Sequence, residues 1–426
     1  MTEHQLLLFL IEIIVVVLAA RLGGELAVRL GIPEVVGELA LGLCLGPSLL
    51  GVLWPGGFEA LFPDEPTQRS LLELMGWIGV LFLVTLSGWE TRLGTLRRSG
   101  RVLGGAWVGG FFLPFVMGFG LGWLIPSSLV GAGVDRPVFA LFMGTAMSIS
   151  AIPVIARILI DLELLQTRIG MVILSAAVAD DVVGWIVLAV VTGLATAGAV
   201  DGAAILTTLG GTALFVVVAF TVGQWLVRRT IQLAGRRLRA PHARTTTTVL
   251  IVLIGAAITQ ALHVHLVLGA FIGAILVTRS RGKDHVGIGA IRIVGMAFFV
   301  PFFFGYTGVK VDLTTLDVST LPIAAGALAV ACVGKLVGGT VGARVGGLQW
   351  SDAWAVGAGL NARGAMELVI AAIGLSIGVL TLPMYSIVVL IAICTTLMAG
   401  PMLRRYRDKY VKEAVAIPEL PLEVSA

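Results

Sequence analysis

The sequence predicts an all-α membrane protein, because of its composition, its low charge and its recurring apolar runs. Hydrophobic residues make up 58% of the 426 residues, charged residues 13%, and 55 residues are glycine. Soluble domains carry roughly twice that share of charge, and the mean hydropathy here is +1.01. Strand-like alternation is absent, so helices are the expected spanning structure. This composition excludes a soluble enzyme, a nucleic-acid-binding protein and a secreted disulfide scaffold.

About thirteen runs have the length of a membrane span. The first is flanked by Glu3 and His4 rather than by basic residues, so we interpret it as a span and not as a signal peptide. No soluble domain separates the runs, which predicts one membrane domain, 1–404, and a short cytoplasmic tail, 405–426. The runs are roughly 5–25, 33–51, 69–91, 99–125, 137–160, 166–194, 203–228, 244–262, 264–279, 287–309, 320–343, 352–378 and 382–403.

Lysine and arginine predict the orientation. Of the 29 basic residues, 24 lie in alternate loops or in the C-terminal tail. Arg69, Arg136 and Lys310 lie in the loops between, and Lys335 and Arg363 lie inside apolar runs. Because cytoplasmic loops carry the excess of lysine and arginine, we expect a multi-pass protein of the cell membrane. Its N-terminus is expected outside and its C-terminus in the cytoplasm.

Two runs are interrupted by polar or helix-breaking residues. The fifth contains Ser148-Ile-Ser-Ala-Ile-Pro153, and the twelfth contains Gly359-Leu-Asn-Ala-Arg-Gly364. Interrupted helices at matching positions indicate the binding site of a transporter. The hydroxyls of Ser148 and Ser150, with the carbonyls freed by the break, are candidate ligands for a partly dehydrated cation. The simpler interpretation is a pair of ordinary kinks, which membrane helices tolerate.

The positions of the two interruptions predict an inverted-topology repeat. Successive spans alternate in direction, so spans seven places apart run in opposite directions. Spans 1–6, at about 5–194, then form one repeat and spans 8–13, at about 244–403, the other. A linker helix at about 203–228 joins them, and the two broken helices are expected to cross.

Five polar side chains are expected near the middle of the membrane. A rise of ~1.5 Å per residue places Asp180 and Asp181 about 18–20 Å from the inner face. The same rise places Lys335 and Ser148 at ~13 Å and Arg363 at ~16 Å. Similar depth is a necessary condition for one shared site.

The adjacent carboxylates of Asp180 and Asp181 point to ion transport. A charged carboxylate at the centre of a membrane helix costs at least ~2.5–3.5 kcal/mol, so both must be paired or functional. Neighbouring helical positions point ~100° apart, which disfavours the shared proton of an intramembrane aspartyl protease. Lys335 either pairs with one aspartate or extends to the interface. A buried lysine can lose its proton, unlike arginine, so an Asp–Lys pair suits proton-coupled cation exchange.

Two further pairs of charged residues allow a structural role as well as a functional one. Arg363 and Glu367 are four residues apart and can pair with each other, or Arg363 can compensate the carbonyl ends of a broken helix. Glu34 and Glu38 are also four residues apart, near the inner end of the second span. We expect Glu38 to support folding or to line a funnel rather than to bind the ion.

The chain resembles the second family of monovalent cation:proton antiporters, which includes bacterial sodium/proton antiporters, glutathione-gated potassium efflux systems and plant cation/H+ exchangers. Five ordered motifs carry the resemblance over about 5–404. They are Pro33-Glu-Val-Val-Gly-Glu-Leu-Ala-Leu-Gly with Leu45-Gly-Pro-Ser, Ser148-Ile-Ser-Ala-Ile-Pro-Val-Ile-Ala-Arg-Ile-Leu159, Ala179-Asp-Asp-Val-Val-Gly-Trp185, Phe302-Phe-Phe-Gly-Tyr-Thr-Gly-Val-Lys-Val-Asp-Leu313 and Asn361-Ala-Arg-Gly-Ala-Met-Glu-Leu368.

The resemblance implies roles for the central charges. The second aspartate, Asp181, is the ligand of the monovalent cation and the proton carrier, and Asp180 pairs with Lys335. The segment with Asn361, Arg363 and Glu367 looks most like the plant-type exchangers. The double aspartate with Lys335 looks like the electrogenic bacterial branch. The family fold is a homodimer with a scaffold domain and a moving ion-binding core.

The expected function is a secondary active Na+ and/or K+:proton antiporter and not an enzyme. Its partners are these cations, protons and the lipid bilayer, with no cofactor. Two alternatives stay open. One is a potassium efflux system of the glutathione-gated type without its regulatory domain, and the other is a sodium-coupled organic anion symporter.

Overall fold

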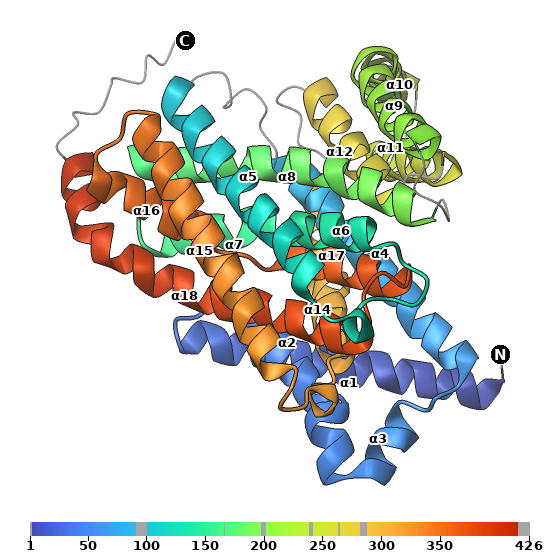
Figure 1. The fold of residues 1–426 in the computed structure, drawn as a ribbon. Helices are drawn as coiled ribbons and strands as arrows, with labels where there is room; N and C mark the ends of the chain where they lie inside the picture. The colour runs from blue at the N-terminus through green and yellow to red at the C-terminus, as the bar shows by residue number, and fades with distance from the viewer. Residues whose placement is uncertain are drawn as a thin grey trace.

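The computed structural model describes residues 2–90, 100–165, 167–196, 202–237, 242–262, 265–281 and 288–415. Within these ranges every regular element is a helix, and one isolated bridge joins Val130 to Leu380 (Figure 1). Ten of these helices are long and apolar enough to cross a membrane, or eleven if the bent pair in 350–376 counts as one span. The all-helical membrane fold is confirmed, and the count of thirteen spans stays a prediction.

In the described part of the N-terminal half there are ten helical elements. They are α1 (Glu3–Arg29), α2 (Glu34–Leu45), η1 (Pro47–Gly51), α3 (Pro55–Leu61), α4 (Pro66–Glu90), α5 (Gly100–Leu124), η3 (Ser127–Leu129), α6 (Arg136–Ser148), α7 (Ile152–Asp161) and α8 (Arg168–Thr196).

The residues described in the C-terminal half form thirteen. They are α9 (Gly202–Val218), η4 (Ala219–Gly223), α10 (Gln224–Arg237), α11 (Ala243–Ala261), α12 (Leu266–Arg281), α13 (Ile288–Val294), η5 (Gly295–Phe299), α14 (Val300–Val309), η6 (Leu313–Thr315), α15 (Leu321–Val345), α16 (Trp350–Leu360), α17 (Ala365–Ser376) and α18 (Leu382–Val415).

Each predicted run coincides with a helix or with consecutive helices. The linker run at 203–228 is α9 and α10 joined by the π-helical turn η4, and it continues to Arg237. The predicted tail is partly helical: residues 405–415 continue α18, since no glycine or proline follows Pro401 before Val415. Residues 416–426 lie outside the described ranges.

The helices form two groups that pack closely within themselves and touch each other sparsely. The α1 group consists of α1, α2, α4 and α11–α14, and the α5 group consists of α5–α8 and α15–α18. The two groups meet where α8 contacts α12, where α14 contacts α17 and where α2 contacts α18. In Figure 1, α1 and α2 lie below the α5 group, and α9–α11 cluster at the upper right. This boundary between the groups is called the seam below.

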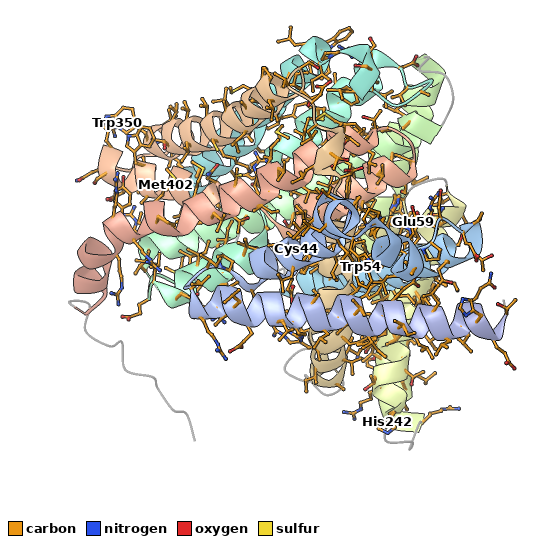
Figure 2. The ribbon with its side chains drawn as sticks, turned by 90° about the horizontal axis from the view of Figure 1, so that it is seen from below. Cys44, Trp54, Glu59, His242, Trp350 and Met402 are labelled. Atoms are coloured by element: carbon orange, nitrogen blue, oxygen red, sulfur yellow. The ribbon has the colours of Figure 1, made fainter. Side chains whose placement is uncertain are left out.

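The basic segments that were predicted to share the inner side lie near each other. Arg407 in α18 pairs with Glu163, just after α7, at 2.7 Å. A Cβ added at Gly31, just after α1, would lie 3.6 Å from Nη2 of Arg404. Figure 2 shows Met402, in the same part of α18, at the left of the view.

The segments predicted to lie outside also meet. The side-chain amide of Gln5 donates a hydrogen bond to Glu65 at 3.1 Å. Thr381 donates to the carbonyl of Leu129 at 3.0 Å. Figure 2 shows Glu59 on the side of the view opposite to Met402.

Glycine permits the closest helix packing inside the α5 group. A Cβ on Gly338 in α15 would lie 2.2 Å from the carbonyl oxygen of Gly109 in α5. Small residues allow such close approach between membrane helices. At Gly326, in the same helix, an added Cβ would meet no neighbouring atom within 4 Å.

We predict that Gly338→Ala destabilises the protein by about 1–3 kcal/mol, because the added methyl overpacks the α5–α15 contact. The measurement is the thermal unfolding midpoint of the purified protein in detergent. Gly326→Ala is the matched control and should leave the midpoint unchanged or raised. Equal midpoints for the two variants would contradict this account.

Candidate functional site

Both predicted interruptions are real breaks in helices. α6 ends at Ser148 and α7 begins at Ile152, while α16 ends at Leu360 and α17 begins at Ala365. The axes of α16 and α17 differ by 44°. Gly364, the last residue of the second break, has a φ of 141°, which glycine adopts without steric cost.

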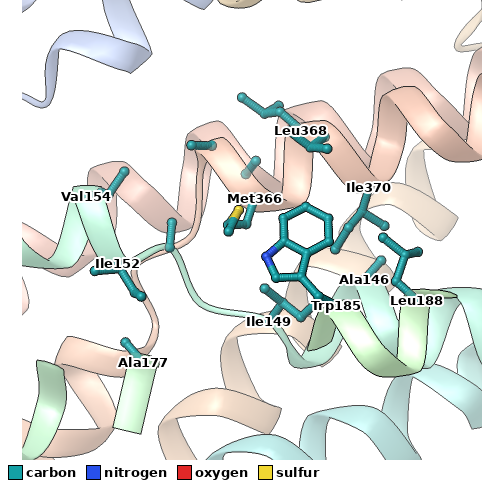
Figure 3. Packing of buried hydrophobic residues seen from close by; sticks show 14 of the residues in the cluster. Ala146, Ile149, Ile152, Val154, Ala177, Trp185, Leu188, Met366, Leu368 and Ile370 are labelled. Carbon is teal, nitrogen blue, oxygen red and sulfur yellow. The ribbon is translucent and has the colours of Figure 1, made fainter. Parts of the chain in front are cut away.

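The two breaks cross each other. The backbone N–H of Ala151 donates to the carbonyl of Ala362 at 3.3 Å, and the hydroxyl of Ser150 donates to the carbonyl of Leu360 at 2.9 Å. Figure 3 shows the apolar side chains packed around this crossing, with Met366 among them. Polar groups in such surroundings must pair with one another, because burying an unpaired one costs free energy.

Asp180 is held by two partners, one from α15 and one from the break between α6 and α7. Its Oδ2 lies 2.6 Å from Nζ of Lys335 in α15 and accepts a hydrogen bond from Ser150 at 2.8 Å. Asp180 is 1% exposed and Lys335 0%. The structure therefore places the lysine on the first aspartate, as the resemblance implied, and not at the membrane interface.

Asp181 faces a different neighbour. It is 1% exposed, and its Oδ2 accepts a hydrogen bond from the hydroxyl of Ser87 in α4 at 2.9 Å. α8 belongs to the α5 group and α4 to the α1 group, so this contact crosses the seam. Sequence reasoning missed Ser87, although a serine in the apolar run 69–91 is a signal for it.

Arg363 combines both roles considered for it. This fully buried guanidinium donates to the carbonyl of Ala146 at 2.9 Å and to that of Met147, at the end of α6. It donates to the carbonyl of Ala331 at 3.3 Å and lies 3.4 Å from the Glu367 carboxylate. The Arg363 side chain thus donates hydrogen bonds to carbonyls that the break in the fifth run leaves without helical partners.

Ser148 and Asn361 occupy the ends of the broken helices. The Ser148 hydroxyl donates to the carbonyl of Thr145 at 2.9 Å, within its own helix. Asn361 is the C-cap of α16, is fully buried and lies beside the thiol of Cys332. Of the two predicted serine ligands, Ser150 is hydrogen-bonded to Asp180, whereas Ser148 bonds to its own helix.

Glu38 belongs to a separate cluster. It is 3% exposed and lies 3.9 Å from Nη1 of Arg21, which also pairs with Glu34 at 2.8 Å. Arg21 further donates to the carbonyls of Met296 and Ala297 in η5. The cluster joins α1, α2 and η5 within the α1 group, and the structural role of Glu38 stays a prediction.

The sequence and the fold are similar to those of known transporters. The profile of the family described as "Sodium/hydrogen exchanger, transmembrane" matches residues 13–408. The Na(+)/H(+) antiporter NhaS4 of Synechocystis sp. is 34% identical over 405 residues, which are 94% of this chain and 98% of that protein. Cation/H(+) antiporter 18 of Arabidopsis thaliana is 30% identical over 404 residues. The alignment spans 94% of this chain but only 49% of the plant protein.

A solved structure shares the fold. The sodium proton antiporter MjNhaP1 from Methanocaldococcus jannaschii superimposes with a TM-score of 0.67 at 14% identity. The match covers 97% of this chain and 100% of the other. At this identity the similarity concerns the arrangement of helices alone, and it agrees with the predicted fold class.

We predict that removing one partner of the Asp180–Lys335 pair destabilises the protein by about 3–5 kcal/mol, because the other charge is left buried and uncompensated. Lys335→Met and Asp180→Asn test this singly. The double variant should lose less stability than the sum of the two, as measured by unfolding in detergent. Strictly additive losses would show that the two groups do not interact.

Proposed function

The chain belongs to the sodium/hydrogen exchanger family, and we propose that it exchanges a monovalent metal cation, Na+ or K+, for protons across a membrane. One observation carries this proposal. Two adjacent buried carboxylates face different partners: Asp180 contacts an ammonium and Asp181 contacts a hydroxyl across the seam. Asp180 is paired with Lys335 within the α5 group, and Asp181 lies on the seam.

Asp181 is the group that takes up cation and proton in turn. A carboxylate binds either a proton or a monovalent cation, so an arriving cation displaces the proton and a returning proton displaces the cation. The Ser87 hydroxyl offers a further oxygen ligand from the opposite helix group. The low-dielectric surroundings strengthen both interactions.

Lys335 supplies the second proton in this scheme. A cation bound at Asp181 also attracts Asp180 and weakens its attraction for the ammonium. A lysine that loses its partner in a buried site gives up its proton readily. Two protons then move against one cation, and exchange is electrogenic. Ser150 contributes by holding the Asp180 carboxylate against the crossing.

Alternating access follows from the arrangement of the helices. We propose that the two repeats, about 5–194 and 244–403, each contribute one broken helix to the crossing. The α5 group moves against the α1 group and carries Asp181 from one side of the membrane to the other. The protein functions without a cofactor as a homodimer in the cell membrane, with its N-terminus outside and its C-terminus in the cytoplasm.

Exchange is favoured over the two alternatives. The relatives compared above are named as antiporters, which supports exchange rather than sodium-coupled symport or regulated potassium efflux. The buried lysine beside Asp180 can also release a proton during exchange, whereas an organic anion symporter does not need such a group.

We predict that Asp181→Asn reduces cation-dependent proton movement to background, because an amide neither titrates nor carries the charge that binds a cation. The measurement is recovery of a pH gradient in everted vesicles when Na+ and K+ are added in turn. Glu25→Gln is the control, since Glu25 pairs with Arg29 at the surface. Normal exchange by a normally expressed Asp181→Asn protein would refute the assignment.

We predict that a membrane potential alone drives cation movement in reconstituted protein at zero pH gradient. Lys335→Gln should reduce this voltage dependence more than it reduces cation affinity, because its amide can still donate to Asp180 but cannot release a proton. Wild-type transport that is indifferent to voltage would refute the two-proton scheme and leave the exchange function intact.

A further inference from the structure

A polar cavity lies on the seam, toward the side that is predicted to be outer. It has a volume of about 190 Å³, and residues of α4, α14 and α17 line it. Glu73 and Trp77 come from α4, Tyr306 and Lys310 from α14 and the residue after it, and Ser376 from α17. α4 and α14 belong to the α1 group and α17 to the α5 group, so the cavity opens between the two groups that contribute to the central site.

The cavity contains one charge of each sign among the described residues that line it. Lys310 Nζ lies 4.7 Å from the ring centre of Tyr306 and 5.9 Å from that of Tyr385, so two aromatic faces stabilise the ammonium. Glu73 is exposed and close enough to act electrostatically on Lys310. The hydroxyl of Tyr385 donates to the carbonyl of Thr307 at 2.9 Å, which fixes the wall of the cavity across the seam.

The cavity and the central site lie along the same helix. From Glu73 to Ser87, the residue that contacts Asp181, α4 advances fourteen residues, or about 21 Å. Val80 lines the cavity, and Val84, one turn further, is fully buried. The cavity is therefore closed toward Asp181 by apolar packing and is a compartment distinct from the ion site.

We propose that this cavity is the outer vestibule of the exchange route, that Glu73 recruits the monovalent cation into it, and that Lys310 limits how strongly the cation is held. The inference rests on the proposed exchange function. A carboxylate in an opening with low-dielectric walls raises the local concentration of cations. The cavity has room for water molecules of roughly 30 Å³ each, so the cation can enter with part of its hydration shell. Lys310 competes for the same carboxylate and keeps the cation from being trapped.

The test measures the cation dependence of proton movement on each face separately. Right-side-out vesicles present the outer face to the medium, and everted vesicles present the inner face. Glu73→Gln should raise the half-saturating concentration of Na+ or K+ at the outer face by about three- to tenfold, with the inner value unchanged. Lys310→Gln should shift the outer value in the opposite direction. Glu73→Asp, which keeps the charge, should restore most of the wild-type value.

Glu65→Gln is the matched control, because Glu65 is an exposed carboxylate of the outer side that bonds to Gln5 and lies outside the cavity. Glu65→Gln should leave the half-saturating cation concentration unchanged at both faces. An unchanged outer value in Glu73→Gln, or equal shifts on both faces, would overturn the vestibule role. Absence of cation-dependent proton movement in the wild type would instead overturn the exchange function itself, and it is seen before any variant is compared.

Discussion

A charge in the hydrocarbon layer must be matched by another charge or lose its own, and this constraint organises the centre of the molecule. An isolated charge at the middle of a membrane helix costs several kcal/mol. Lys335 and Asp180 meet at 2.6 Å. Arg363 donates to the carbonyls at the end of α6 and also contacts the Glu367 carboxylate. Each helix that carries a central charge is thereby positioned by its partner, and the crossing of the broken helices is where these partners become close.

Because the two aspartates are adjacent on α8, they face different neighbouring helices. Neighbouring positions on α8 point ~100° apart, so one helix presents a carboxylate to α15 and another to α4. The first contact lies within the α5 group and the second crosses the seam. The structure therefore places a buried charge pair inside the α5 group directly beside a carboxylate on the seam.

The sequence predicted the elements of the fold better than the contacts between them. Apolar length and the alternation of basic loops located the helices, and the rise per residue placed the central charges at similar depth. The rise per residue gives the depth of a side chain in the membrane but not the direction in which it points around the helix axis. The sequence therefore did not reveal that Asp181 meets Ser87. It also left two roles open for Arg363, because the carbonyls of Ala146 and Met147 become its partners only when the breaks cross. Glu73 and Lys310 are 237 residues apart in the chain, and only packing brings them to one cavity.

The distribution of close packing bears on how the two groups can move. Inside each group, glycine brings backbones into contact, as at Gly109 and Gly338 in the α5 group and at Gly23 and Gly37 in the α1 group. Such contacts resist separation, since interiors packed at this density respond to strain as units. The seam is joined by fewer contacts and contains both the Asp181–Ser87 hydrogen bond and the outer cavity. Displacement of one group against the other would therefore break fewer interactions than separation of helices within a group, among them the Asp181–Ser87 and Tyr385–Thr307 hydrogen bonds.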